Sequence, residues 1–494
     1  MLIEAIKPKA VLKGLNRVEL RNLASKDEIT TEFGSPAYIS YVRSRSAKFT
    51  EVIEDQPNPA QADLIKKGLE YISKKVMILT ERTMCQSAEI KFLCHFYVTK
   101  DYARNALMWH EMLFEPIKKD KPDLVVVSIP EWPERKVLVL INECVTFIFG
   151  SDYTGEVKKA FLRMAMYLVK KRGWLGLHAG SKIIKVREKT QKLISKGILL
   201  FGLSGTGKTV LTCHHHNLSG DEGVIIKQDD VVFLKPDGSA IGTENNFYMK
   251  TEGVNPKTDP VLYPAVISHN AILENVFVEE DGTVDFNNWL LTSNGRAVVM
   301  RKEMSYTDEG IDLPYTNILI FICRRNDIIP PVIKLTTEQG AAFFMLGESV
   351  ETSAGDPTQV GKAKRVVGTN PLIIGPEENE GNRFYEIIKQ HPDMEIYVLN
   401  TGRVGGDNGE KITVQESAEI IKQIARGAIK WSVDPDWHYL IPIEIPNIDL
   451  QLYNPLNYYT EQEYQDRVKQ LKKERIEWLN RFTNLAPEIR NALG

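Results

Sequence analysis

The stretch Gly197-Ile-Leu-Leu-Phe-Gly202-Leu-Ser-Gly-Thr-Gly-Lys208-Thr209 carries the strongest pattern in this sequence. A short apolar run leads into Gly-x-x-x-x-Gly-Lys-Thr, which predicts a strand, a glycine-rich turn and a helix from Val210. Glycines let successive backbone N–H groups point at one anion, a lysine adds a mobile cation, and a threonine hydroxyl can hold a divalent ion. We therefore predict a loop that binds nucleotide phosphates. It consists of Gly202, Leu203, Ser204, Gly205, Thr206, Gly207, Lys208 and Thr209.

Two neighbouring carboxylates follow this loop by about twenty residues. The run Gly223-Val-Ile-Ile-Lys-Gln-Asp229-Asp230 is typical of a buried strand that ends in two acids. Adjacent side chains of a strand point to opposite faces, so only one of the two can face the phosphates and a metal ion. In isolation such a pair is often only a turn. Beside a phosphate loop, the pattern favours a functional site.

The composition is that of a globular protein. The chain has 494 residues, of which 43% are hydrophobic, and 62 basic against 65 acidic residues give a net charge of −3. These values exclude wholesale disorder and nucleic-acid binding driven by bulk charge. Five cysteines without a Cys-x-x-Cys pair fit a reducing cytosol, and no apolar run approaches the roughly 18 residues of a membrane span. We expect a cytoplasmic protein with no nucleic-acid and no membrane partner.

The hydrophobic pattern predicts an α/β chain of two domains. Apolar positions at helical spacing predict helices over 61–80, 102–114 and 160–169, and an exposed amphipathic helix over 459–482. Short β-branched runs predict buried strands over 124–129 and 137–141. Strand and helix signals alternate more clearly after Gly173, so we expect one domain over 1–173 and another over 174–494.

Three further clusters bear on the kind of phosphate-loop protein. They are Tyr153-Thr-Gly-Glu-Val-Lys158-Lys159, a strand-like run that ends in His178, and Asn-Gly-Arg296. Taken singly, a lysine pair usually marks an exposed helix face, and a lone histidine after an apolar run is usually an ordinary core or surface residue. Their joint occurrence around one phosphate loop is what favours a functional reading.

In this order and spacing, the clusters resemble the ATP-dependent phosphoenolpyruvate carboxykinases. The similarity runs from about Arg45 to beyond Ser417. The resemblance implies an N-terminal substrate-binding domain, a C-terminal nucleotide-binding domain that contains the phosphate loop, and a lid at about 350–366. Further segments that look like the family are Tyr97-Val-Thr-Lys-Asp-Tyr-Ala-Arg-Asn-Ala-Leu, Leu273-Glu-Asn-Val and Asp281-Gly-Thr-Val-Asp-Phe286.

The resemblance also implies roles on the substrate side. Arg45 would grip the carboxylate of oxaloacetate or phosphoenolpyruvate, and Tyr153 would lie beside the substrate or carbon dioxide. Lys158 would be a neighbouring cation, and Arg296 would bridge the γ-phosphate and the substrate. With Lys208 these groups would stabilise the enolate that remains after decarboxylation and the phosphoryl group that it attacks.

The implied metal ligands come from distant parts of the chain. Lys159 and His178 would bind Mn²⁺ through nitrogen, and Asp230 through oxygen, whereas Thr209 would hold the Mg²⁺ that accompanies ATP. Lysine binds a metal only when it is neutral, a state that the adjacent Lys158 and a divalent cation would favour. A mixed nitrogen and oxygen ligand set accepts Mn²⁺ without selecting it.

On the nucleotide side, the resemblance implies contacts from Asp229 and Asp259, and an adenine-side strand with Lys411, Ile412 and Ser417. Two of these positions depart from the family pattern, because Lys411 stands where an arginine is expected and Ser417 where a threonine is expected. Without a planar guanidinium, stacking on the base should be weaker.

The implied reaction is oxaloacetate + ATP ⇌ phosphoenolpyruvate + ADP + carbon dioxide, carried out by a monomer or a small homo-oligomer. Two alternatives stay open: a phosphate-loop kinase that acts on another small acid or hydroxyl compound, and a nucleotide-binding regulator without turnover. His214-His215-His216 could suggest another metal site. Consecutive helix positions point about 100° apart, so we expect no shared ion there.

Overall fold

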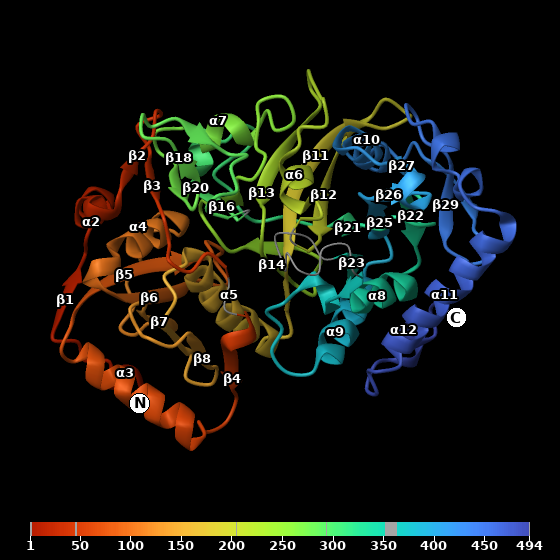
Figure 1. The fold of residues 1–494 in the computed structure, drawn as a ribbon. Coiled ribbons are helices and arrows are strands. Elements are labelled where there is room, and N and C mark those ends of the chain that lie inside the picture. Colours follow the sequence, from red (N-terminus) through yellow and green to blue (C-terminus); the bar gives the residue numbers. More distant parts are fainter. Residues whose placement is uncertain (1, 45–46, 204, 293, 351–362, 494) are drawn as a thin grey trace. The chain divides into compact units, whose positions relative to one another are not determined.

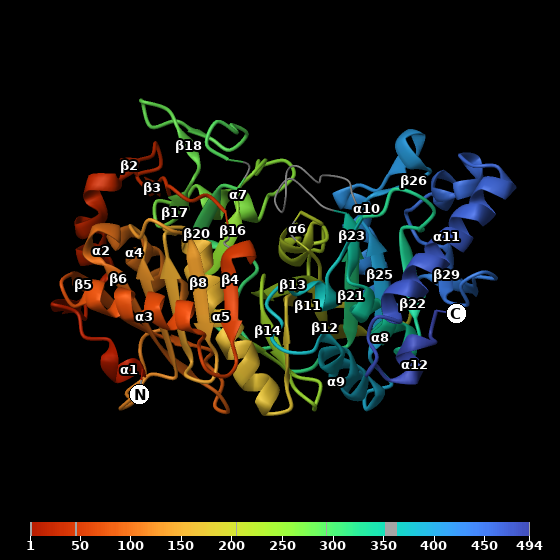
Figure 2. The same ribbon diagram turned by 60° about the horizontal axis from the view of Figure 1, so that its bottom comes forward.

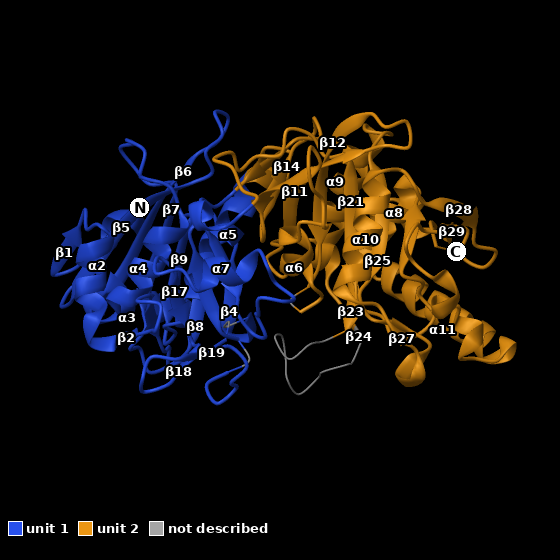
Figure 3. Cartoon of the chain, turned by 90° about the horizontal axis from the view of Figure 1, so that it is seen from above, with its two compact units in different colours: residues 1–168, 243–305 blue, residues 169–242, 306–494 orange. Residues whose placement is uncertain are grey.

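The computed structural model describes residues 2–44, 47–203, 205–292, 294–350 and 363–493 (Figure 1). The chain forms two compact units: Met1–Leu168 with Thr243–Ser305, and Val169–Gly242 with Tyr306–Gly494 (Figure 3). The chain first passes from one unit to the other after Leu168, close to the predicted boundary at residue 173. The single boundary needs correction, however, because 243–305 return to the first unit. They do so by strand pairing, since Leu273 pairs with Ala37, and such pairing leaves no trace in a linear reading.

The first unit contains a seven-stranded sheet with helices on both faces (Figure 2). Ile65 and Ile72 of α3 (Pro59–Ile72) pack against one face, beside Val125 and Phe147. On the other face, helices α4 (Ala103–Met112) and α5 (Thr154–Lys171) meet through Trp109 and Phe161, whose ring centroids lie 4.6 Å apart. In sheet order, the strands are β1 (Ala10–Lys13), β5 (Val76–Met84), β6 (Phe92–Thr99), β7 (Leu124–Ile129), β9 (Val145–Phe149), β8 (Lys136–Leu140) and β4 (Thr50–Ile53).

A second, five-stranded sheet of this unit combines two distant parts of the chain. Segment 243–305 contributes three strands and the short helix α7 (Leu262–Val266), and the N-terminal region contributes two strands and helix α2 (Arg17–Ala24). In sheet order, the strands are β16 (Phe247–Lys250), β20 (Arg296–Val299), β17 (Ile272–Glu274), β3 (Pro36–Tyr38) and β2 (Ile29–Thr30). Arg296 is the first residue of the strand that lies between β16 and β17 in this sheet.

The second unit is built on a mixed eight-stranded sheet. Helices α8 (Thr337–Leu346) and α9 (Glu377–Lys389) cover one face, where Phe344 and Phe384 stack, and α6 (Lys208–Cys213) and α10 (Val414–Ala425) cover the other. The strands are β13 (Gly223–Gln228), β11 (Ala179–Arg187), β12 (Leu193–Phe201), β21 (Ile318–Cys323), β25 (Glu395–Asn400), β22 (Val332–Leu335), β29 (Leu440–Glu444) and β28 (Lys430–Val433). A small sheet adds β10 (Leu175–Leu177), β14 (Val232–Leu234) and β15 (Ala240–Gly242).

Most predicted elements are present, with one clear error at a boundary. The strand predicted over 124–129 coincides with β7, and the helix predicted over 160–169 lies inside α5. The helix predicted over 61–80 ends at Ile72, and Val76 instead begins β5. A run of apolar residues from Val76 pairs with both β1 and β6, and this pairing outweighs the helical spacing. Within the described ranges, no helix combines the length and apolarity needed to cross a bilayer.

The C-terminal helix α11 (Glu461–Leu479) is anchored by a buried charge. Arg475 is fully buried between the rings of Phe343 and Trp437, and its Nε donates to Glu348 Oε2 at 3.1 Å. Arg365 also donates to Glu348, at 2.9 Å. Helix α11 is therefore not simply the exposed helix that its alternating charges predict.

We expect Arg475→Met to lower the free energy of unfolding by about 3–5 kcal/mol, because it removes one partner from a buried ion pair. Chemical denaturation of both proteins measures this loss. The matched control is Lys473→Met on the same helix, where the lysine is 77% exposed and should contribute less than about 1 kcal/mol. Equal stabilities of the two variants would show that the buried pair contributes nothing.

Candidate active site

Strand register brings several predicted residues to one edge of the eight-stranded sheet. Strands β12, β21 and β25 are parallel, so the phosphate loop, Arg324 and Thr401 all follow carboxyl ends at this edge. Strand β11 is antiparallel to β12, and Ala179 pairs with Phe201, which places His178 at the same edge. Strand β13 ends there as well, because Gln228 pairs with Ser181. Ligands of open α/β sheets bind outside the carboxyl ends of the strands.

The phosphate loop has the backbone that its glycines predict. Gly205 and Gly207 have φ angles of +83° and +96°, a left-handed region that side chains disfavour. Thr206 is buried, its hydroxyl donates to the carbonyl oxygen of Leu203 at 2.8 Å, and its own carbonyl accepts from the hydroxyl of Thr401. These contacts fix the loop just before α6 begins at Lys208. Ser204 lies outside the described residues.

Two predicted residues of this unit converge on the carboxylate of a third, Asp230. The Nζ atom of Lys208 lies 3.2 Å from Asp230 Oδ1, and His178 Nε2 lies 3.0 Å from the same oxygen. All three side chains are at most 14% exposed. Asp229, the neighbouring acid, is 4% exposed, and its implied contact with the nucleotide stays a prediction. Thr209 is half-buried on α6.

The two donor atoms fit a shared cation. The Nδ1 atom of His178 lies 2.7 Å from the carbonyl oxygen of Thr369, which can only accept, so Nδ1 carries the proton and Nε2 can present a lone pair toward Asp230. Two ligands about 2.1 Å from one ion at right angles would be about 3.0 Å apart. The separation of His178 Nε2 from Asp230 Oδ1 has this value. Lys159, the third implied ligand, is half-buried on α5 of the first unit, so its place in this site stays a prediction.

A pocket of about 340 Å³ lies beside the phosphate loop. Lys411, Ile412 and Ser417, the residues implied on the adenine side, all line this pocket. Ile412 and Ser417 are buried, and Lys411 is exposed. The other lining residues are Gly205, Thr206, Gly207, Val210, Leu211, Arg324, Thr401, Thr413, Val414 and Gln415.

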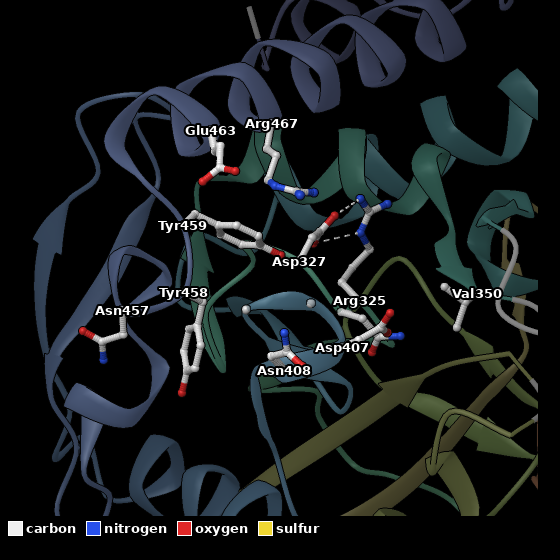
Figure 4. Close-up of a pocket in the computed structure, with 13 residues that line it drawn as sticks. Arg325, Asp327, Val350, Asp407, Asn408, Asn457, Tyr458, Tyr459, Glu463 and Arg467 are labelled. Atoms are coloured by element: carbon white, nitrogen blue, oxygen red, sulfur yellow. Dashed lines mark hydrogen bonds and ion pairs between the residues drawn. The ribbon is translucent and has the colours of Figure 1, made fainter.

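A second pocket of the same unit, of about 780 Å³, has a different chemistry (Figure 4). Arg325 is paired with Asp327 at 2.5 Å, and Arg467 stacks over the ring of Tyr459. Asp407 and Glu463 also line the pocket, so its carboxylates outnumber its cations. This balance disfavours a polyphosphate. The pocket beside the loop is therefore the better nucleotide site.

In the first unit, Tyr153 and Arg296 lie together. Arg296 Nε lies 3.2 Å from the hydroxyl oxygen of Tyr153, and its Nη2 donates to Asn294 Oδ1 at 2.7 Å. The amide nitrogen of Asn294 reaches the same hydroxyl at 3.1 Å. Tyr153 is 2% exposed, so the cluster is rigidly packed. Asn294 thus orients both predicted residues.

Lys158 belongs to the same cluster. Its Nζ atom lies 2.9 Å from Glu244 Oε2 and 5.5 Å from the ring centroid of Tyr248, over which Arg296 also lies. Lys250 pairs with Arg296 across the sheet, and burial, followed by the charge of Arg296, lowers the pKa of Lys250 to about 8. Glu244, Tyr248 and Lys250 are site residues that the sequence pattern did not predict. Cross-strand pairing of β16 with β20 brings Tyr248 and Lys250 to Arg296, and Glu244 lies just before β16.

The segment that leads toward Arg45 is held by Asp152. Its two carboxylate oxygens accept from the backbone N–H groups of Tyr41 and Val42, each at 2.8 Å, and Arg104 donates to the same carboxylate. Arg45 itself lies outside the described residues, as does most of the lid predicted at about 350–366.

Asp259 has a local role in the structure. Its carboxylate accepts a 2.5 Å hydrogen bond from the hydroxyl of Thr258, and its backbone carbonyl accepts from Tyr263 N–H, so it organises the turn before α7. It belongs to the first unit, whereas the phosphate loop belongs to the second. Its implied contact with the nucleotide stays a prediction.

The three consecutive histidines lie after helix α6 rather than in it, since α6 ends at Cys213. The argument from helix geometry therefore does not apply to them. His214 and His216 are buried beside Lys182, whose Nζ atom lies 2.5 Å from His216 Nε2 and 3.5 Å from the carbonyl oxygen of His214. Burial lowers the pKa of Lys182 to about 7, and burial followed by Lys182 lowers the pKa of His214 to about 4. Among the described residues, no group of three His, Cys, Asp or Glu side chains is placed to hold a metal ion.

The low pKa of Lys182 predicts a pH-dependent stability. Unfolded, this lysine keeps its proton up to about pH 10.5, so between pH 7 and that value the unfolded chain binds more protons and stability rises with pH. Relative to Lys182→Met, the wild-type free energy of unfolding should rise by roughly 3–4 kcal/mol from pH 7 to pH 10. Denaturant titrations at several pH values measure the slope. Lys185→Met, which changes an exposed lysine of the same strand, should show no such difference.

The fold is that of a mixed α/β protein. One edge of its eight-stranded sheet carries a phosphate loop and a paired histidine and aspartate. A family model described as phosphoenolpyruvate carboxykinase matches residues 47–451. A protein of Aeropyrum pernix named phosphoenolpyruvate carboxykinase (ATP) is 36% identical over 427 residues, 86% of this chain and 84% of that protein. A protein of the same name from Staphylococcus aureus (strain bovine RF122 / ET3-1) is 26% identical over 443 residues, 81% of this chain and 76% of that protein. The chain belongs to the ATP-dependent phosphoenolpyruvate carboxykinase family.

Proposed function

We propose that this protein converts oxaloacetate and ATP into phosphoenolpyruvate, ADP and carbon dioxide. The observation that carries the proposal is the convergence of Lys208, His178 and Asp230 at the edge of the sheet that holds the phosphate loop. A loop alone would serve any nucleotide-dependent protein. Here a histidine and a carboxylate beside the lysine of the loop could bind a further cation. Such a cation suits a reaction in which negative charge also develops on a second substrate.

The second unit would bind the nucleotide. Backbone N–H groups of the phosphate loop and the ammonium group of Lys208 would hold the phosphates, and Thr209 would bind the Mg²⁺ that accompanies ATP. The pocket lined by Lys411, Ile412 and Ser417 would take the adenine. Asp230 pairs with Lys208 at 3.2 Å, and the bound phosphates would draw the ammonium group toward themselves.

The first unit would bind oxaloacetate. Arg45 would pair with a carboxylate of the substrate, and Asp152 supports this by fixing the backbone of Tyr41 and Val42. Tyr153 would lie beside the substrate or carbon dioxide. Arg296, oriented by Asn294, would stabilise the charge of the transferred phosphoryl group, with Lys158 as a neighbouring cation.

The histidine and the aspartate fit a divalent ion, and Lys159 would complete its protein ligands. We propose Mn²⁺ for this site, since imidazole and carboxylate ligands accept it. When bound, such an ion supplies positive charge that stabilises an enolate oxygen. The Thr369 carbonyl contributes by fixing the proton of His178 on Nδ1.

The two alternative functions would need fewer of these residues. A kinase of another small acid would need the phosphate loop but neither Arg45 nor Lys159. A regulator without turnover would need no cation beside Tyr153. Arg296 contacts the hydroxyl of Tyr153, and both Arg296 and Lys158 lie over the ring of Tyr248.

The test is to incubate the purified chain with oxaloacetate and ATP, with and without Mn²⁺, and to measure phosphoenolpyruvate, ADP and carbon dioxide. We expect equal amounts of all three products, and only with a divalent ion. In a parallel incubation with another small acid or hydroxyl compound, ADP formed without carbon dioxide would favour the kinase. Bound ATP without any ADP would favour the regulator.

A further inference from the structure

The second unit contains a buried lysine with no part in the proposed chemistry. Lys182 on β11 is fully buried beneath the phosphate-loop helix. Its Nζ atom lies 2.5 Å from the carbonyl oxygen of Leu211 and 3.5 Å from that of His214. These carbonyls lie at the C-terminal end of α6, where backbone oxygens lack helical partners. The lysine therefore fixes the end of the helix that begins at Lys208.

His216 extends this contact to a second helix. Its ring Nε2 lies 2.5 Å from Lys182 Nζ, and its Nδ1 lies 2.7 Å from the carbonyl oxygen of Ala418 on α10. A carbonyl only accepts, so Nδ1 carries the proton and Nε2 accepts from Lys182. His216 has a φ of +57°, an uncommon conformation that turns its ring back under the helix.

Both ends of this connection reach the nucleotide pocket. Helix α6 starts directly after Gly207 of the phosphate loop. On α10, Ala418 follows Ser417, which lines the pocket. The polar chain from Leu211 through Lys182 and His216 to Ala418 thus joins the helix on the phosphate side to the helix on the adenine side.

We infer that Lys182 and His216 are positioning residues that set the spacing between the phosphate loop and the adenine side of the nucleotide pocket. This inference rests on the proposed nucleotide site. Neither residue lines the pocket, so their effect on the nucleotide is exerted through α6 and α10. A ligand that contacts both helices gains affinity from correct spacing, because one bound half places the other. A ligand that contacts only the loop gains nothing.

Two ligands separate this role from ordinary packing. Inorganic tripolyphosphate carries the phosphates of ATP without adenine, so it reports on the loop alone. We expect Lys182→Met and His216→Leu to weaken ATP binding about tenfold while tripolyphosphate binding changes less than about twofold. His216→Asn should restore most of the ATP affinity, since its amide nitrogen can take the place of Nδ1 and donate to Ala418. Isothermal titration calorimetry of the full-length chain measures all four proteins.

His215→Gln is the matched control, since this neighbouring ring is half-buried, lies against Tyr306 and accepts from the backbone N–H of Asn217; it should bind both ligands like the wild type. Equal weakening of ATP and tripolyphosphate, or unchanged ATP binding in folded Lys182→Met and His216→Leu, would overturn the inference. Wild-type protein that binds ATP no better than tripolyphosphate would instead overturn the proposed adenine pocket. The two failures are therefore distinguishable.

Discussion

Arg296→Ala and Lys159→Ala should each lower the turnover of oxaloacetate by at least about a thousandfold, while both variants still bind ATP. Arg296 is the cation that Tyr153 and Asn294 orient, and its loss removes charge stabilisation that matters only as the phosphoryl group is transferred. Loss of Lys159 would remove one proposed metal ligand. The phosphate loop is held by contacts of the other unit, so nucleotide binding should survive.

Steady-state rates of phosphoenolpyruvate formation, together with calorimetric ATP binding, separate these two effects. Lys302→Ala, which removes an exposed lysine of the same unit, is the control and should keep the wild-type rate. Near-normal rates in both Arg296→Ala and Lys159→Ala would contradict the site assignment.

Lys208→Ala should behave differently, because it should lose ligand binding as well as turnover. The side chain of Lys208 is 8% exposed and its ammonium group lies against Asp230, from where it can turn toward the phosphates. Without it, the phosphates would meet the carboxylate of Asp230 with no compensating cation. We expect ATP and tripolyphosphate to bind about a hundredfold more weakly, and turnover to fall by about a thousandfold.

The same calorimetric titrations measure this loss for both ligands. Lys192→Ala, an exposed lysine of the same unit, should leave both affinities unchanged. If Lys208→Ala bound tripolyphosphate as the wild type does, the loop would not be the phosphate site.

The sequence pattern predicted the features that neighbouring residues determine, such as the strand and the glycine-rich turn of the phosphate loop. The apolar run 197–201 forms the end of β12, and the left-handed glycines follow it because only glycine adopts that backbone at little cost. The strand predicted before the two acids is β13, which ends at Gln228, directly before Asp229.

Features set by distant pairing could not be predicted. Segment 243–305 joins the first unit through sheet contacts such as Leu273 with Ala37, and no local signal marks such a return. Lys250 reaches Arg296 only because β16 pairs with β20. The roles of Lys182 and His216 depend on β11, α6 and α10 packing together.

We propose that Lys159, His178 and Asp230 bind one Mn²⁺ ion, and Mn²⁺ titration tests this proposal most directly. Electron paramagnetic resonance of free Mn²⁺, titrated with wild type and with Lys159→Ala, His178→Ala and Asp230→Asn, counts the bound ions. We predict one tight site in the wild type without nucleotide, weakened at least about tenfold in each variant. Wild-type affinity in Lys159→Ala, or in both His178→Ala and Asp230→Asn, would contradict the account.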